Sequence, residues 1–447
     1  MLRLLVLILL FAPAAAAQQS DLHKELEALR RDHEAQSKRL AELEKQLGGQ
    51  PKDAQDEHRH TDVAHAKVGD VDLRLIDISL NGLFAAGFSS ATNDELEGLQ
   101  AGGHDPRRRG FTLQQIEFSI TGAVDPYFKG EGHIVIGEDG FELEEAFLIT
   151  TSLPAGLEVE AGHFFTEFGL INPVHPHDWD FMDHPVIHSR LLGPDGLRGS
   201  GVRLGWEMPL PWFSKLHAGV QNANEPIMVS FNGAGHAHEG EGVEETVGGW
   251  PRVERGVETA ADLLYLLRWE NGVALSDWRL NLGVSGLFGP NASGDHGKTW
   301  IFGGDVLLKF KPPGHEHSVL KIQGEFMYRY FQAEGATLED STFLEPTVLG
   351  DWGGYLQGTV NVYHHVFVGL RVEFADAFRD GEELRREDPL RDRRYRVSPM
   401  IQWSVSHFAR LRLQYNFEHM EHLDRSPAHS VWFGVEFLIG AHGRHDD

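Results

Sequence analysis

The sequence predicts an all-β fold, a closed barrel of sixteen antiparallel strands that crosses a membrane. Three observations support this prediction. From about residue 75 onward, short segments alternate apolar and polar residues, which gives each segment one face suited to lipid and one suited to water. The connections are alternately long and short, as in outer-membrane barrels with long external loops and short periplasmic turns. The number of segments is even, as such barrels usually require.

The first seventeen residues have the pattern of an export signal. Arg3 precedes an uncharged apolar run, and the small residues Ala15-Ala16-Ala17 come before Gln18. The apolar run is well short of the ~20 residues that a membrane-spanning helix needs. We therefore predict a signal peptide over 1–17 and a protein of the bacterial outer membrane.

Residues 18–49 carry a heptad seam. Its members follow one another at alternating spacings of four and three, and they are Leu22, Leu26, Leu29, His33, Gln36, Leu40, Leu43 and Leu47. This pattern predicts a periplasmic α-helical coiled coil that joins the protomers of a homotrimer. The alternative is a single amphipathic helix packed on another surface. Residues 50–74 then read as a polar linker.

The barrel is predicted over 75–440, followed by a tail over 441–447. Its final third is the clearest part, since Val397, Ile401 and Trp403 share one face while Gln402 and Ser404 share the other. The predicted strands are 78–88, 111–122, 126–137, 142–151, 156–165, 199–208, 215–222, 259–271, 277–288, 298–311, 316–332, 351–363, 365–376, 395–406, 409–420 and 428–440.

The amino-acid composition excludes some classes of function and of metal site. The formal charge of −27 argues against nucleic-acid binding, which requires a basic footprint. Cysteine is absent, so a metal site would need His, Asp, Glu or backbone oxygen. No nucleophile motif points to an enzyme. The run of arginines from Arg107 to Arg109 could bind lipopolysaccharide phosphates. The predicted pore-lining residues carry both signs: Lys129, Glu131, Arg203, Arg279, Glu325, Arg329, Arg371, Glu373, Arg410 and Arg412.

The third external connection, residues 166–198, holds the densest set of chemical groups. Between His175 and His184 it has three histidines and three aspartates. In a water-filled barrel such a loop can fold inward, so we expect it to form the constriction. Imidazole with carboxylate suits zinc, copper, iron or nickel. The alternative is a structural role, with Trp179, Phe181 and Met182 packing against the wall while the polar side chains bind backbone groups.

Parts of this region resemble a known family, the bacterial proteins labelled zinc-regulated TonB-dependent outer-membrane receptors. The matching residues are Ala161-Gly162-His163-Phe164-Phe165, the His-x-His-x-Trp-Asp-Phe-x-Asp pattern of His175 to Asp183, and Gly201-Val202-Arg203-Leu204. The resemblance implies transport that responds to zinc. It also implies a metal role for His175, His177, Asp180 and Asp183, to which this sequence adds His184.

The overall plan is also similar to that of phosphate-selective porins. A TonB-dependent transporter has a plug inside a 22-stranded barrel, whereas sixteen strands use nearly all of the chain after the linker. We therefore expect a porin-type channel for small hydrophilic solutes, related to transition-metal uptake, with Zn²⁺ as the possible bound ion. The alternative is a general anion or phosphate porin without a metal site, favoured by Arg203, Arg279, Arg371, Arg410 and Arg412.

Overall fold

The structure is a computed structural model that describes residues 64–68, 71–99, 102–138, 140–233, 246–253, 255–315, 317–338, 341–378, 391–421, 423 and 426–440. The chain has two units, Met1–Arg59 and His60–Asp447, and all described residues belong to the second. The predicted signal peptide, coiled coil and tail lie outside the described residues, so the coiled-coil trimer stays a prediction. No helix in the described part is long and apolar enough to cross a membrane.

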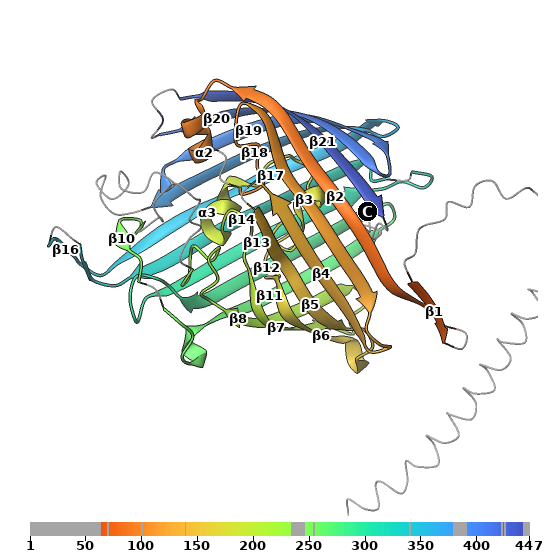
Figure 1. The fold of residues 1–447 in the computed structure, drawn as a ribbon, viewed down its shortest axis with the longest axis horizontal. Helices are drawn as coiled ribbons and strands as arrows, with labels where there is room; N and C mark the ends of the chain where they lie inside the picture. Colours follow the sequence, from red (N-terminus) through yellow and green to blue (C-terminus); the bar gives the residue numbers. More distant parts are fainter. Residues whose placement is uncertain are drawn as a thin grey trace, which may run out of the picture. The chain divides into compact units, whose positions relative to one another are not determined.

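Sixteen long antiparallel strands form a closed barrel (Figure 1), because each pairs with its neighbours and β21 returns to β2. Their bounds are β2 Val71–Ser89, β3 Gly110–Ala123, β4 Phe128–Gly137, β5 Gly140–Thr150, β6 Leu157–Phe165, β7 Arg198–Glu207, β8 Phe213–Asn222, β11 Leu263–Leu275, β12 Trp278–Pro290, β13 Lys298–Phe310, β14 Leu320–Ala333, β17 Thr347–Tyr363, β18 Val366–Phe378, β19 Arg394–Ser406, β20 Ala409–Met420 and β21 Ala428–Gly440.

Short elements lie before the first long strand or in the connections between the long strands. A small strand, β1 (Ala64–Val68), pairs with the start of β2. The others are α2 Asn93–Leu99, η1 Pro154–Gly156, η2 Pro176–Asp178, α3 Val186–Leu192, β9 Thr246–Val247, β10 Trp250–Pro251, η3 Ala260–Asp262, β15 Ala336–Thr337 and β16 Phe343–Leu344.

The predicted strand plan is confirmed, with differences at some ends. The last two strands, 409–420 and 428–440, have the predicted bounds. The first strand begins at Val71, so β1 and the start of β2 lie within the stretch predicted as linker. The strand predicted from residue 259 begins at Leu263, because Thr259 caps the turn η3 that precedes it.

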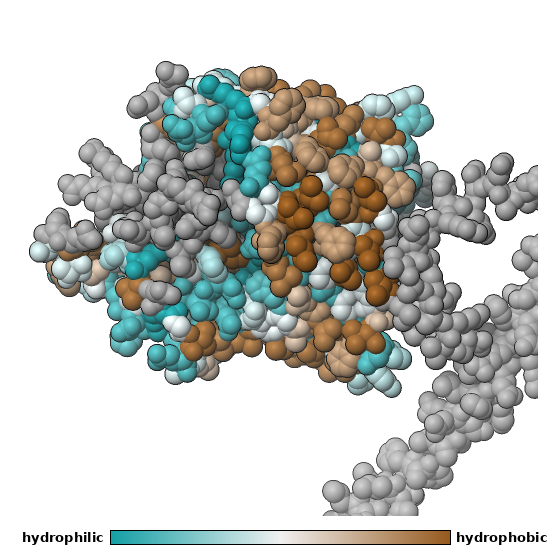
Figure 2. All heavy atoms as spheres, viewed as in Figure 1, coloured by the Kyte–Doolittle hydropathy of each residue, from teal (hydrophilic) through white to brown (hydrophobic). Residues whose placement is uncertain are grey.

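The outer face of the barrel is apolar. Figure 2 shows apolar side chains gathered over the strands and hydrophilic ones toward the loops. Alternate residues such as Leu356, Leu370, Ile401 and Leu413 are about half exposed, while the residues between them turn inward. A closed barrel satisfies every strand hydrogen bond internally, and an apolar outer face can therefore lie in lipid. The protein is an outer-membrane β-barrel.

Lipid contact can be tested on one strand. Leu356 lies near the middle of β17 and Val362 lies near its periplasmic end, both on the outer face. Leu356→Arg is expected to cost about 2–4 kcal/mol of folding free energy, because it places a charge at the bilayer midplane, and Val362→Arg about 0–1 kcal/mol. Urea unfolding in lipid vesicles measures the difference. Equal losses at the two positions would contradict the assignment of this face to lipid.

The interior of the barrel is not an empty pore. The helix α3 lies within the ring of strands (Figure 1), next to β17 and β18. Its apolar residues and those of the segment 223–231 form one buried cluster with inward-facing apolar residues of β11 to β14 and β18. The cluster comprises Phe168, Val186, Ile187, Leu191, Leu192, Leu197, Ala223, Ile227, Met228, Phe231, Leu264, Leu266, Leu287, Ile301, Met327 and Ala375. The predicted inward folding of loop 166–198 is therefore observed, and this loop is called the constriction loop below.

Candidate functional site

The constriction loop meets the barrel wall at strands β3, β4 and β5. His133 pairs with Glu145 across β4 and β5, whereas the next residue, Ile134, pairs with Leu143. Glu144 is therefore the extra residue of a β-bulge, and such a bulge can turn two successive side chains to the same face. Glu144 and Glu145 are both buried, and both contact His175 of the loop.

Three histidines and Glu117 meet at this point of the wall. The two oxygens of Glu117 face different rings: Oε1 lies 3.0 Å from Nδ1 of His133, and Oε2 lies 3.4 Å from Nδ1 of His175 and 3.0 Å from Nδ1 of His177. The rings of His133 and His175 are 4.5 Å apart, and those of His175 and His177 are stacked at 5.6 Å. We call Glu117, Glu131, His133, Glu144, Glu145, His175 and His177 the His/Glu cluster.

The carboxylates set the charge of the loop histidines. Burial lowers the pKa of His175, but the carboxylates of Glu117 and Glu144 raise it more, so this pKa lies well above the ordinary value. Burial also lowers the pKa of His177, and Glu117 reverses the effect, leaving a raised pKa. Without a metal the loop is thus tied to the wall by imidazolium and carboxylate pairs.

The His/Glu cluster has donors suited to a transition metal. Glu117, His133 and His175 each offer a ligand atom, and these atoms lie within 4.8 Å of one another. Imidazole nitrogen with carboxylate oxygen is a usual donor set for zinc, whose bonds are ~2.0–2.2 Å long. Two ligands of a tetrahedral ion with such bonds lie ~3.4 Å apart, so the side chains need to close by up to about 1.4 Å. A divalent cation would also replace the protons that now offset the carboxylate charges.

The five metal-ligand candidates predicted from the sequence do not meet at one point. His175 and His177 are in the His/Glu cluster. Asp180 instead pairs with Lys321 on β14 at 3.0 Å and accepts a hydrogen bond from Gln357 on β17. Asp183 and His184 are buried against β18 to β20.

Asp183 is a buried anchor of the loop. It pairs with Arg371 and, at 3.3 Å, with Arg396, and it accepts hydrogen bonds from Gln414 at 2.8 Å and Asn416 at 2.6 Å. Burial raises the pKa of Asp183, but the two guanidinium groups lower it by a larger amount. The net pKa lies below the ordinary value, so the carboxylate is charged. Its two oxygens thus face Arg371, Arg396, Gln414 and Asn416, so protein donors surround this carboxylate.

His184 fills a structural position beside this anchor. Its ring stacks on Trp179 with centroids 4.7 Å apart, and its Nδ1 lies 2.8 Å from the hydroxyl of Ser189. Burial, together with the charges of His188 and Arg371, lowers its pKa well below the ordinary value. Trp179, Phe181 and Met182 are half-buried or buried. In this half of the loop they thus have the packing role predicted from the sequence as the alternative to metal binding.

The predicted pore-lining residues all lie on inward-facing rows, but most of them hold the loop instead of facing open water. Buried members are Arg203, Glu325, Arg329, Arg371, Glu373 and Arg412. Lys129, Glu131, Arg279 and Arg410 keep more exposure. A set of arginines is concentrated on β18 to β20, where Glu373 and Glu418 pair with several of them, whereas β3 to β5 carry the carboxylates of the His/Glu cluster. The arginine set comprises Arg371, Arg394, Arg396, Arg410 and Arg412.

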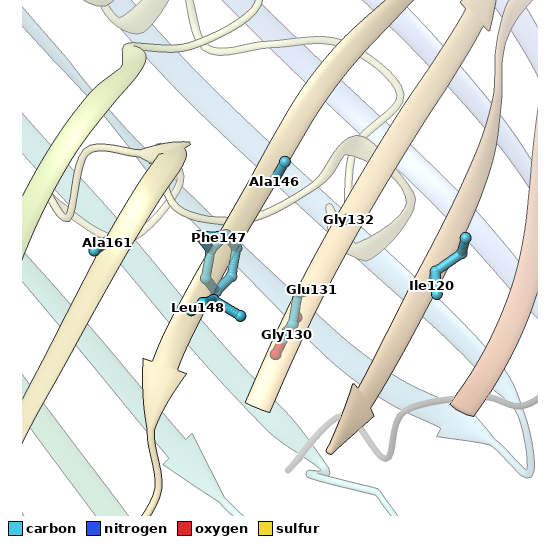
Figure 3. A pocket seen from close by; sticks show the side chains of 8 residues that line it. All are labelled: Ile120, Gly130, Glu131, Gly132, Ala146, Phe147, Leu148 and Ala161. Atoms are coloured by element: carbon cyan, nitrogen blue, oxygen red, sulfur yellow. The ribbon is translucent and has the colours of Figure 1, made fainter. Parts of the chain in front are cut away.

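The wall residues of the His/Glu cluster are absent from the set of metal ligands predicted from the sequence. Glu117 and His133 follow the inward alternation of their strands, but alternation alone does not say which inward residues meet the loop. The adjacent pair Glu144-Glu145 interrupts the alternation of β5, and this was the one available signal of a bulge. The same strands bound a shallow hollow (Figure 3), lined by Ile120, Gly130, Glu131, Gly132, Ala146, Phe147, Leu148 and Ala161.

Comparisons with known proteins agree on the barrel. No family model matches the sequence. An uncharacterized protein of Aquifex aeolicus (strain VF5) is 28% identical over 400 residues, which cover 83% of this chain and 80% of that protein. The outer membrane channel DcaP of Acinetobacter baumannii superposes with a TM-score of 0.51 at 12% identity, covering 81% of this chain and 96% of that one. OprB of Pseudomonas putida gives 0.50 at 9% identity, covering 81% and 94%. The chain thus has a porin-like barrel fold.

Proposed function

We propose that this protein is a porin-type channel of the bacterial outer membrane whose constriction loop binds zinc against the barrel wall. The ligands are Glu117 of β3, His133 of β4 and His175 of the loop, with Glu144 and His177 beside them. The solutes are small and hydrophilic, and divalent transition-metal ions are the favoured cargo.

The observation that carries the proposal is the position of the His/Glu cluster. It joins the loop that crosses the lumen to the wall that bounds it, so an ion bound there lies where solute must pass. The side chains of His133, His175 and His177 keep 12–14% exposure, so water reaches them. The resemblance of the stretch 161–204 to zinc-regulated outer-membrane receptors also favours zinc.

Planar-bilayer recordings with zinc in the bath test this function. A bound Zn²⁺ adds two positive charges at the constriction, so current and ion selectivity are expected to change as zinc is added. Glu117→Gln is expected to reduce the response, because it deletes the carboxylate that faces all three histidines. The matched control is His163→Ala, since His163 contacts Ser200 and lies outside the cluster. Heat-modifiable gel mobility confirms that each variant is folded.

Two outcomes would reject the zinc role. One is a wild-type current that does not respond to zinc. The other is a response that persists unchanged in folded Glu117→Gln.

A general anion or phosphate porin is the second candidate, and the arginines on β18 to β20 favour it. Most of its proposed anion-binding residues already have acidic partners: Arg203 pairs with Glu160, Arg371 with Glu373, and Arg410 with Glu436. Arg279 is exposed. The reversal potential in a salt gradient separates the candidates, because preference for cations supports the zinc channel and preference for anions supports the alternative.

A further inference from the structure

The His/Glu cluster has two sides, and the proposed zinc site uses only one of them. His133 and His175 lie ring to ring at 4.5 Å, and each has its Nδ1 toward Glu117. Their Nε2 atoms meet a second carboxylate, Glu145, whose Oε2 lies 2.9 Å from His175 and 4.0 Å from His133. The ring pair is therefore enclosed between two glutamates on opposite nitrogens.

Glu131 provides a fourth possible ligand on the Nε2 side of the two rings. Oε2 of Glu131 lies 3.7 Å from Nε2 of His133, while its Oε1 is held by Lys129 at 2.6 Å. Oε1 of Glu145 accepts the backbone N–H of Phe165 at 2.8 Å. Both carboxylates are thus fixed by one oxygen and present the other to the histidines. Two nitrogens and two oxygens form a donor set of the kind that zinc takes in four-coordinate sites.

We infer that the cluster holds a second divalent-metal position, formed by Glu131, His133, Glu145 and His175 on the Nε2 side of the two rings. The inference rests on the proposed zinc site, from which it differs by the nitrogen used on each ring. The same two rings then serve two ions, each ring as an imidazolate that has released its remaining N–H proton to solvent. This shared use of the rings couples the two positions.

The strand register places the two positions in series along the barrel. Glu117 pairs with Val135, His133 pairs with Ser119, and Glu131 pairs with Thr121, which is closer to the short turn after β3. Exposure rises in the same direction, from 1% for Glu117 to 12% for His133 and 23% for Glu131. An ion leaving the first position toward the periplasm therefore meets the second before it reaches open water.

Zinc stoichiometry of the full-length, detergent-folded protein tests the inference, measured by competition with a chromophoric chelator. Wild type is expected to bind two zinc ions per chain. Glu145→Gln should retain one ion, since it removes a ligand of the second position only. Glu117→Gln is the matched variant and should retain the other ion. Both replace a buried carboxylate that faces the same two rings.

Copper supplies an independent readout. Two Cu²⁺ ions that share imidazoles are magnetically coupled, so wild type should show a coupled electron paramagnetic resonance signal and each variant an isolated copper signal. One zinc ion in wild type, unchanged in Glu145→Gln, would overturn the second position and leave the proposed function standing. No zinc in wild type would overturn both. Two ions without coupling, or two ions in both variants, would overturn the shared-ring geometry.

Discussion

Asp183→Ala is expected to release the second half of the constriction loop and to raise single-channel conductance. Asp183 is fully buried and pairs with two buried arginines, Arg371 and Arg396. Removing one partner of a buried ion pair leaves an uncompensated charge and typically costs about 3–5 kcal/mol. Glu373 still neutralises part of that charge, because it pairs with the same two arginines. The barrel is therefore expected to remain folded while the loop loses its anchor.

Asp180→Ala is the matched control, because Asp180 lies three residues earlier in the same loop. Its ion pair with Lys321 is partly exposed, with 20% and 27% of the two side chains accessible, and such a pair contributes about 0–1 kcal/mol. Conductance in Asp180→Ala should stay near the wild-type value. Equal conductance in the two variants would show that Asp183 does not hold the loop. If Asp183→Ala lost zinc binding while its conductance stayed at the wild-type value, Asp183 would instead be a zinc ligand.

The fold could be predicted because its signal is local. Each strand alternates lipid-facing and inward residues, and this alternation can be read within about ten positions. The late start of β11 at Leu263 has an equally local cause. Thr259 and Asp262 form a capping box, in which each side chain accepts a hydrogen bond from the other's backbone N–H, and this motif begins a helical turn instead of a strand.

The candidate site could be predicted only in part. The density of His and Asp between His175 and His184 drew attention to a loop that folds into the barrel, but it did not reveal that the loop side chains separate. Asp183 turns to Arg371, which lies 188 residues later, and His175 turns to Glu144, which lies 31 residues earlier. Partners at such separations depend on how strands are arranged around the barrel, and neither spacing nor alternation encodes that arrangement.

Gly169→Ala is expected to loosen the first half of the same loop. Gly169 has φ +68, and a Cβ added there would lie 1.9 Å from Oε2 of Glu325. That carboxylate accepts the N–H groups of Leu170 and Ile171, each at 3.0 Å, and the hydroxyl of Tyr355 at 2.7 Å. The methyl group would displace Glu325 and leave two backbone donors unpaired, at about 1–3 kcal/mol each. Hydrogen exchange of the loop peptides should become faster.

Gly314→Ala is the control that separates the cost of a positive φ from the cost of displacing a neighbouring side chain. Gly314 has φ +84, and a Cβ there meets no atom within 4 Å, so this variant has the backbone cost without displacing a neighbour. If Gly169→Ala left exchange at Leu170 and Ile171 as slow as in Gly314→Ala, Glu325 would not be the anchor. His175 follows Ile171 by only four residues, so the loosened loop should also bind zinc more weakly. Because a ligand that binds only the seated loop stabilises it, saturating zinc should restore slow exchange in Gly169→Ala.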